Sequence, residues 1–309
     1  INPSASNEII GKAVYRRTLV LSTSARLLCG YIYVSSGSGE STQDLVYSGH
    51  CIIAENGTSL AENKPFEEKE LTVTEIDVKK LAYERHKNTS FEPVTDVTFV
   101  KFNQEIRKTE ITRPIDKAPF VPSDKAALSS RAEAILRIQS YGLKKRLEHT
   151  RAKTAVIGVS GGLDSTLALL VTVRAMKLLN RPLSDICAVT MPGFGTTKRT
   201  HSNSEKLCSL LGVTFKEVNI TAAVEQHFKD IGQDPACLDV TYENSQARER
   251  TQVLMDIANK SGGMVIGTGD LSELALGWAT YNGDHMSMYA VNSSVPKTLV
   301  RYLVRYEAE

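Results

Sequence analysis

The chain of 309 residues has no apolar run long enough to cross a bilayer. Its near-apolar stretches, such as Ala155–Val159 and Leu167–Val171, are far shorter than the about 20 residues that a membrane-spanning helix needs. The chain also has no large excess of one charge, because 37 lysines and arginines nearly balance 35 aspartates and glutamates, for a net charge of +2. We therefore expect no membrane and no nucleic acid as a partner, and any phosphate chemistry must be local.

Cysteine and tryptophan are scarce. There is one tryptophan, Trp278, and the five cysteines are widely spaced, with no CxxC pair. An odd number of separated cysteines favours reduced core thiols over a disulfide framework or a zinc site, which predicts a reducing, cytoplasmic setting. With 41% hydrophobic and 23% charged residues, the composition is that of an ordinary globular protein of about two domains.

Neither end of the chain carries the signals of a natural terminus. The first residues contain no initiator Met and no signal-peptide order, and Leu299–Tyr306 is an apolar-periodic segment with no Gly or Pro exit after it. We therefore expect the chain to begin and to end inside domains.

Residues 1–90 are rich in short strands. We predict helices over Gly11–Leu28 and Val78–Lys87, and Asn56-Gly57 is a strong signal for a two-residue hairpin turn. The predicted strands are Tyr31–Val34, Asp44–Tyr47, Cys51–Ala54 and Leu71–Ile76. Residues 88–123 hold four of the ten prolines, so we expect residues 91–123 to connect two domains.

Residues 124–309 alternate strands with helices, after Ser123 as a helix N-cap. The predicted strands are Thr154–Val159, Asp185–Met191, Thr214–Asn219 and Gly263–Gly267. The predicted helices between them are Ser165–Leu179, Thr200–Leu211, Thr221–Ile231 and Glu243–Asn259. This alternation predicts an α/β fold with a doubly wound parallel sheet, whose ligands lie at the carboxyl ends of the strands.

The strongest motif is Ser160-Gly161-Gly162-Leu163-Asp164-Ser165, which follows one predicted strand and opens a helix. Adjacent glycines let the backbone approach an anion, and a helix N-terminus adds partial positive charge, so the loop suits phosphate. The alternative is a tight strand-to-helix turn without a ligand. The Gly-Lys-Ser/Thr ending of a Walker A motif is missing, which excludes chemistry built on that lysine.

This hexapeptide resembles the signature of the ATP pyrophosphatase superfamily, which splits ATP into AMP and pyrophosphate to activate a carbonyl or carboxyl group. The stretches Tyr242–Arg250 and Gly267–Trp278 resemble hallmark segments of NAD synthetases. That resemblance implies an adenine nucleotide alpha hydrolase-like fold. It implies an ATP- and Mg²⁺-dependent ligase that adenylates deamido-NAD and amidates it with ammonia from glutamine. Two alternatives stay open: another amidating enzyme such as a GMP synthetase, or a catalytically silent fragment that binds nucleotide or assembles with partner subunits.

The resemblance also implies site residues. Those for ATP and pyrophosphate are Ser160, Gly161, Gly162, Asp164, Ser165, Met191, Thr268 and Lys297. Those for deamido-NAD are Asn244, Arg248, Trp278, Tyr281 and Asp284. Asp164 and Glu273 would share the Mg²⁺, and Asp164 and Lys297 are the expected catalytic residues. Because Arg248 and Arg250 stand two apart on a helix, we expect them to point to different faces. A surface ion pair for the arginines, a core role for Trp278 and a solvated Lys297 are the simpler interpretations.

Residues 1–90 resemble the C-terminal part of the nitrilase-like glutaminase domain, an α+β sandwich, that bacterial glutamine-dependent NAD synthetases carry. The matching stretches are Asn2–Lys12 and Gly39-Glu40-Ser41-Thr42, and Ser6 and Lys12 fall on glutamine-contacting positions. The family's Glu, Lys and Cys catalytic groups would lie upstream of Ile1, while Cys29 and Cys51 read as buried structural thiols. Glutaminase activity is not expected from this chain, and a homo-oligomer is.

Overall fold

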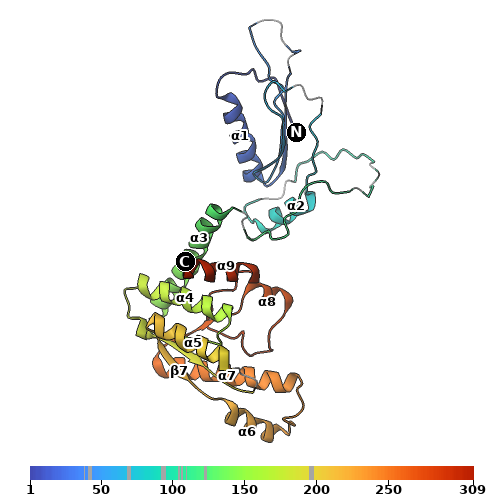
Figure 1. The fold of residues 1–309 in the computed structure, drawn as a ribbon. Helices are drawn as coiled ribbons and strands as arrows, with labels where there is room; N and C mark the ends of the chain where they lie inside the picture. The colour runs from blue at the N-terminus through green and yellow to red at the C-terminus, as the bar shows by residue number, and fades with distance from the viewer. Residues whose placement is uncertain are drawn as a thin grey trace. The chain divides into compact units, whose positions relative to one another are not determined.

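The computed structural model describes residues 1–37, 39–40, 44–67, 71–91, 95–103, 105, 107–108, 110–121, 124–194 and 198–309. By their internal contacts they form two compact units, Ile1–Ile115 and Asp116–Glu309 (Figure 1). The division falls inside the proline-rich stretch. Among the described residues, no helix is both long and apolar enough to span a membrane.

The first unit is built on one four-stranded sheet. Its elements are β1 (Asn2–Ser4), α1 (Lys12–Leu27), β2 (Gly30–Ser35), β3 (Ile52–Glu55), β4 (Thr58–Glu62) and α2 (Val78–Lys87). The strand order is β1-β2-β3-β4, with β1 parallel to β2 and the other neighbours antiparallel. Helix α1 lies along the strands (Figure 1), and Val20 packs on Tyr33 and Ile52 to form a small core.

The hairpin prediction in this unit is confirmed. Asn56 and Gly57 join β3 to β4 with φ angles of 43° and 81°, the left-handed conformation that a two-residue turn of this kind demands. Both predicted helices also form, with α1 one residue shorter at each end. The three-residue strand β1 was not predicted, because its pairing with β2 depends on a partner about thirty residues away.

Two predicted strands of the first unit are wrong. Among the described residues, Asp44–Tyr47 makes one backbone bond, from the Glu8 amide to the Val46 carbonyl, and pairs with no strand. Leu71–Ile76 is also irregular. There the Ile76 side chain packs against Gly30, and the Glu75 carboxylate accepts hydrogen bonds from the backbone of Thr112 and Arg113. Side-chain contacts replace strand pairing, which β-type composition alone does not reveal.

Arg113 fastens the end of the proline-rich stretch to this sheet. Its guanidinium donates to both carboxylate oxygens of Glu55, at 3.0 and 3.2 Å, and Glu55 also accepts from the Asp77 amide. The Glu55 side chain is only 4% exposed. Burial opposes ionisation, but these hydrogen bonds outweigh it and hold the pKa of Glu55 below its usual value of 4.5.

This pairing predicts an acid-dependent loss of stability in the first unit. Because the folded-state pKa lies below the unfolded value, the stabilisation is complete above pH 4.5 and is lost as the pH falls through the folded pKa. We expect the Glu55→Gln variant to be less stable than the wild type at pH 7, and the difference to shrink between pH 5 and pH 3. Thermal unfolding followed by circular dichroism tests this, with the exposed Glu105→Gln as control. A constant difference across this pH range argues against it.

The second unit has a five-stranded parallel sheet. Its strands are β5 (Ala155–Gly158), β6 (Ile186–Thr190), β7 (Thr214–Glu217), β8 (Met264–Gly267) and β9 (Tyr289–Ala290). Its helices are α3 (Lys125–Thr150), α4 (Leu163–Leu178), α5 (Lys198–Leu211), α6 (Thr221–Ile231), α7 (Val240–Ser261), α8 (Leu271–Leu276) and α9 (Lys297–Ala308), with a 3-10 turn at Leu183–Asp185. The order β7-β6-β5-β8-β9, with every neighbouring pair parallel, confirms the doubly wound fold.

Aspartate side chains cap the starts of α3, α7 and α8. The Asp124 side chain accepts from the Ala127 amide and starts α3, while the predicted cap Ser123 lies outside the described residues. The Asp239 side chain accepts from the amides of Thr241 and Tyr242, so α7 begins three residues before the predicted Glu243. The apolar-periodic C-terminal segment forms α9, and the short strand β9 was not predicted.

The core places helices on both faces of β5. Ala155 and Ile157 belong to the main cluster with Leu167 of α4, whereas Val156 packs with Ala258 of α7 on the other face. Figure 1 shows α4 and α7 on opposite sides of the sheet. From β5 the chain goes first to β6 on one side and returns later to β8 on the other. The carboxyl ends of β5 and β8 therefore lie at a topological switch point, where such folds bind ligands.

Candidate functional site

The predicted phosphate loop lies at that switch point, directly after β5. Gly161 has a φ of +78°, which favours glycine, and Gly162 is the extended N-cap of α4. The Ser165 hydroxyl donates to the Gly162 carbonyl at 3.1 Å, and the Ser160 hydroxyl accepts from the Gly162 amide at 3.3 Å. The serines thus stabilise the turn itself, while the helix N-terminus provides the partial positive charge that suits an anion.

Lys297 joins three carboxylates beside this loop. Its Nζ lies 2.8 Å from Asp164 Oδ2, 2.9 Å from Asp270 Oδ2 and 3.0 Å from Glu273 Oε1. Partial burial works against the charged form, yet the three carboxylates hold the pKa of Lys297 well above its usual value. The ammonium is therefore a fixed positive charge at the ends of β5 and β8. The structure thus brings together Asp164, Glu273 and Lys297, three of the predicted residues.

Asp270 belongs to this cluster and was missed at the sequence level. Its side chain is fully buried and accepts from the Glu273 amide, and the Glu273 carboxylate accepts from the Asp270 amide. This reciprocal pair is a capping box that starts α8. The spacing Asp-x-x-Glu before an apolar pair was the available signal. The box fixes Glu273 with one carboxylate oxygen facing Lys297.

The carboxylates at this site fit a hard divalent cation. Asp164 Oδ1 is buried and has no hydrogen-bond partner among the described residues, and Asp164 Oδ2 and Glu273 Oε1 converge on Lys297. Oxygen donors of this kind suit Mg²⁺, which keeps several ligands from water or phosphate. Within the described ranges, no group of three or more Asp, Glu, His or Cys side chains is arranged as a complete metal site.

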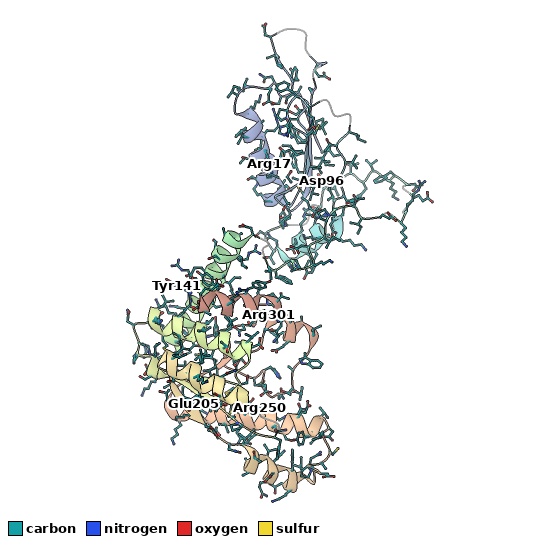
Figure 2. The ribbon with its side chains drawn as sticks, viewed as in Figure 1. Arg17, Asp96, Tyr141, Glu205, Arg250 and Arg301 are labelled. Atoms are coloured by element: carbon teal, nitrogen blue, oxygen red, sulfur yellow. The ribbon has the colours of Figure 1, made fainter. Side chains whose placement is uncertain are left out.

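Helix α7 holds the segment that carries Trp278. The Arg248 Nε donates to the Tyr281 carbonyl at 3.2 Å, while Arg250 (Figure 2) donates to both oxygens of Asp284 at 3.0 and 2.9 Å. The Thr251 hydroxyl donates to the Gly283 carbonyl at 2.8 Å. Both guanidinium groups contact this segment. The expectation that the two arginines point to different faces therefore does not hold for the ends of their side chains.

The crossing of this segment over α7 explains the arrangement. Gly283 lies against Ala247, one turn from Thr251, so the segment crosses the face that these two positions share. Arg248 and Arg250 flank that face on either side and reach it with long side chains. The Trp278 side chain is 80% exposed, which is against the simpler interpretation of Trp278 as a core residue.

Other predicted residues have more local contacts. Met191 is half-buried and packs in two apolar clusters beside Gly158, so its side chain fills the core. In the first unit the Lys12 ammonium donates to Asn7 Oδ1 at 2.9 Å. Cys29 and Cys51 are partly rather than fully buried, and the Cys51 thiol donates to the Gly49 carbonyl. Of the second glutaminase-like stretch, Ser41 and Thr42 lie outside the described residues.

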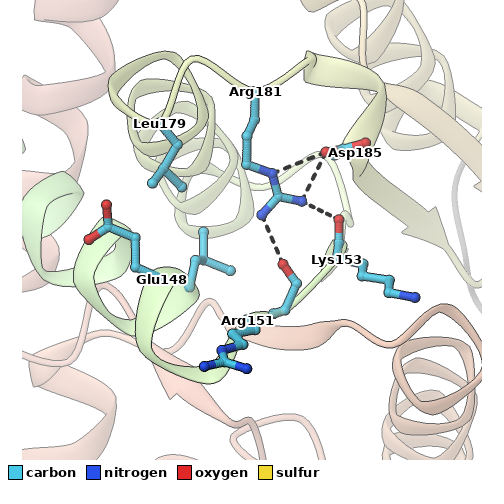
Figure 3. A pocket seen from close by; sticks show the side chains of 8 residues that line it. Glu148, Arg151, Lys153, Leu179, Arg181 and Asp185 are labelled. Atoms are coloured by element: carbon cyan, nitrogen blue, oxygen red, sulfur yellow. Dashed lines mark hydrogen bonds and ion pairs between the residues drawn. The ribbon is translucent and has the colours of Figure 1, made fainter.

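Two cavities of the second unit lie at opposite ends of its sheet. One of about 180 Å³ adjoins the loop and is lined by Gly161, Ser165 and residues of α5. A larger one of about 470 Å³ lies at the amino ends of the strands (Figure 3). There Arg181 donates to Asp185 and to the carbonyls of Ala152 and Lys153. Arg181 therefore ties the segment before β5 to the start of β6 at this end of the sheet.

The fold and the site define a doubly wound α/β protein with a glycine-rich loop and a charged cluster at the switch point. The chain belongs to the NAD synthase family, whose model matches residues 135–308. It is 44% identical over 322 residues to the glutamine-dependent NAD(+) synthetase of Mycobacterium leprae, in an alignment that covers 99% of this chain and 47% of that protein. The chain therefore spans about half the length of this relative.

Solved structures support the fold. The glutamine-dependent NAD+ synthetase of Acinetobacter baumannii, in complex with ADP, has a TM-score of 0.54 and 24% identity, over 99% of this chain and 51% of that one. The NH3-dependent NAD synthetase of Campylobacter jejuni, in complex with the nitrate ion, has a TM-score of 0.52 and 25% identity, over 58% of this chain and 74% of that one. The fold class expected from the sequence is thereby confirmed.

Proposed function

We propose that this chain contains the synthetase site that amidates deamido-NAD to NAD at the expense of ATP. A carboxylate oxygen of the nicotinate attacks the α-phosphorus of ATP, the bond to the bridging oxygen breaks and pyrophosphate leaves. Ammonia then adds to the carbonyl carbon of the adenylate, gives up a proton, and AMP leaves with the former carboxylate oxygen. Two easier steps thus replace the direct attack of ammonia on a carboxylate, which does not proceed unaided because a carboxylate has no adequate leaving group.

The contact of Lys297 with three carboxylates beside the loop is the observation that carries this proposal. A fixed ammonium at a helix N-terminus matches the charge that develops on a departing pyrophosphate. Ser160, Gly161, Gly162 and Ser165 would bind the phosphates, with Thr268 and Met191 nearby on the neighbouring strand ends. Mg²⁺ bound by Asp164 and Glu273 would supply further charge neutralisation on the phosphates. Positioning and charge would account for most of the catalysis, with Asp164 and Lys297 as the catalytic residues.

We assign deamido-NAD to the segment held by α7. Trp278 and Tyr281 are 80% and 73% exposed, and an exposed indole face suits a planar nicotinate ring. Asn244, Arg248 and Asp284 would bind the rest of the dinucleotide. In the first unit, Ser6 and Lys12 would bind glutamine in a longer protein. We further propose a homo-oligomer in a reducing, cytoplasmic setting, consistent with five free cysteines.

Trp278→Ala should raise KM for deamido-NAD about tenfold, because loss of a stacked ring removes on the order of 1 kcal/mol or more of contact energy. KM for ATP and the melting temperature should stay unchanged, since the side chain is largely exposed. Steady-state NAD formation measures this. Tyr141→Ala is a matched control, being an exposed aromatic of α3 (Figure 2). An unchanged KM for deamido-NAD in Trp278→Ala removes the ring-stacking assignment.

NAD formation from ATP, Mg²⁺ and deamido-NAD tests the proposed function, with ammonium or glutamine as the nitrogen source. We expect NAD and AMP with ammonium and none with glutamine, because Cys29 and Cys51 are expected to be structural thiols rather than nucleophiles. Product from glutamine would contradict the expected lack of glutaminase activity. If AMP forms from ATP when the substrate of a GMP synthetase is supplied, but not when deamido-NAD is supplied, the chain is better described as a GMP synthetase. Nucleotide binding without any product would favour a silent fragment.

A further inference from the structure

Asn292 links the two strand ends that form the site. It is fully buried in the turn that follows β9, and its Nδ2 donates to the Asp164 carbonyl at 3.0 Å and to the Thr268 carbonyl at 3.1 Å. The first carbonyl belongs to the opening turn of α4, and the second follows β8 directly. One amide nitrogen therefore joins the loop that binds phosphate to the turn that carries Asp270 and Glu273.

A second buried amide fixes the orientation of the first. The Nε2 of Gln139, from α3, donates to Asn292 Oδ1 at 3.1 Å and to the Val291 carbonyl at 2.8 Å. A donor from Gln139 requires Asn292 to present its oxygen to α3 and its nitrogen to the two carbonyls. Gln139 is itself 9% exposed, so both amides are largely shielded from competing water. We call Gln139 and Asn292 together the amide pair.

The amide pair lies where it can fix the distance between the two strand ends that carry the site. Backbone pairing between β5 and β8 ends at Ile157 and Ile266, before either segment reaches its carboxylates. Beyond that point Asn292 is a direct hydrogen-bonded link between the two backbones, and Lys297 is the side-chain link. The partners of Lys297 are carboxylates, two of which the proposed function assigns to Mg²⁺, whereas the partners of Asn292 are backbone carbonyls.

We propose that Asn292, oriented by Gln139, is a positioning residue that fixes the separation of Asp164 from Asp270 and Glu273 and thereby sets the affinity for Mg²⁺-bound nucleoside triphosphate. The proposal rests on the proposed function for the identity of the nucleotide. The hydrogen bonds of Asn292 that join the two strand ends are present in the unliganded fold and do not depend on the proposed function. Asn292 acts through the backbone of other residues and touches no reacting atom.

Asn292→Asp is the sharpest test, because it keeps the shape and replaces the nitrogen by an oxygen that faces two carbonyl oxygens. We expect the dissociation constant for the ATP analogue AMP-CPP with Mg²⁺ to rise about tenfold or more. KM for deamido-NAD should change less than twofold. Amide hydrogen exchange at Gly161–Ser165 should speed up about tenfold, while exchange in β6 stays as in the wild type. Ser293→Ala removes a hydroxyl from the same turn without touching the amide pair and should behave as wild type.

Gln139→Leu provides a second variant for the case in which Asn292→Asp does not fold. Asn292 keeps its donors there but loses the bond that orients it, so we expect the same changes with a smaller amplitude. Unchanged exchange at Gly161–Ser165 in both variants, or in Gln139→Leu if only that one folds, would overturn the proposal. Wild-type NAD formation reports on the proposed function separately. If it is absent, the exchange measurement still decides whether the link exists.

Discussion

Lys297→Ala is expected to lower kcat for NAD formation by about 10²- to 10³-fold, the range found when one preorganised charge-stabilising group is removed from an active site. The ammonium lies within 3.0 Å of Asp164, Asp270 and Glu273, so its loss removes the positive charge proposed to face the pyrophosphate. It also leaves three carboxylates to repel one another and the phosphates. Steady-state NAD formation with ammonium as donor measures the change.

Two further variants separate charge from geometry at this position. Lys297→Arg keeps the charge, but a planar guanidinium cannot place one compact group among three carboxylates, so most of the loss should remain. Lys177→Ala, at the far end of α4, removes a lysine outside the site and should leave kcat unchanged. Activity of Lys297→Ala within tenfold of the wild type would show that Lys297 has no part in the chemistry.

Phe228→Ala is expected to destabilise the second unit by about 3–5 kcal/mol, the usual effect of deleting a buried aromatic ring. Phe228 is fully buried on α6, where it stacks on Phe194 with ring centroids 6.2 Å apart and on Tyr242 at 5.6 Å. Phe194 follows β6, and its amide donates to Gln246 of α7. The cavity left behind would therefore also loosen the chain at the carboxyl end of β6.

Chemical denaturation followed by circular dichroism measures this loss of stability. Ile231→Ala is the matched control, since Ile231 lies on the same helix but is 49% exposed, and it should cost well under 1 kcal/mol. Equal effects of the two substitutions would mean that the aromatic cluster does not hold α6 to the sheet.

Sequence patterns predicted the second unit better than the first. The strands β5, β6 and β8 are continuous apolar runs buried on both faces, and such runs stand out against amphipathic helices. In the first unit, Leu71–Ile76 has strand-like composition but is held by side chains such as Glu75. No local pattern reports where Thr112 and Arg113 will lie, so this error follows from long-range contacts.

The candidate site shows the same limit. The glycine loop and the Asp-x-x-Glu spacing of Asp270 and Glu273 are local signals, readable because each describes a turn or a helix start. The contact of Lys297 with Asp164, more than a hundred positions earlier, depends on the order of the strands. Asn292 and Gln139 are 153 positions apart and stand in no motif, so only the folded chain reveals their bond.

The fate of the substrate carboxylate oxygen tests the account most directly. We would supply this chain with ATP, Mg²⁺, ammonium and deamido-NAD that carries ¹⁸O in the nicotinate carboxylate, and analyse the products by mass spectrometry. Activation as an adenylate predicts AMP with one ¹⁸O atom and pyrophosphate with none. The second carboxylate oxygen stays in the carboxamide of NAD, so label in NAD is expected as well. Label in pyrophosphate, or NAD formed with unlabelled AMP, would contradict the proposed reaction at this site.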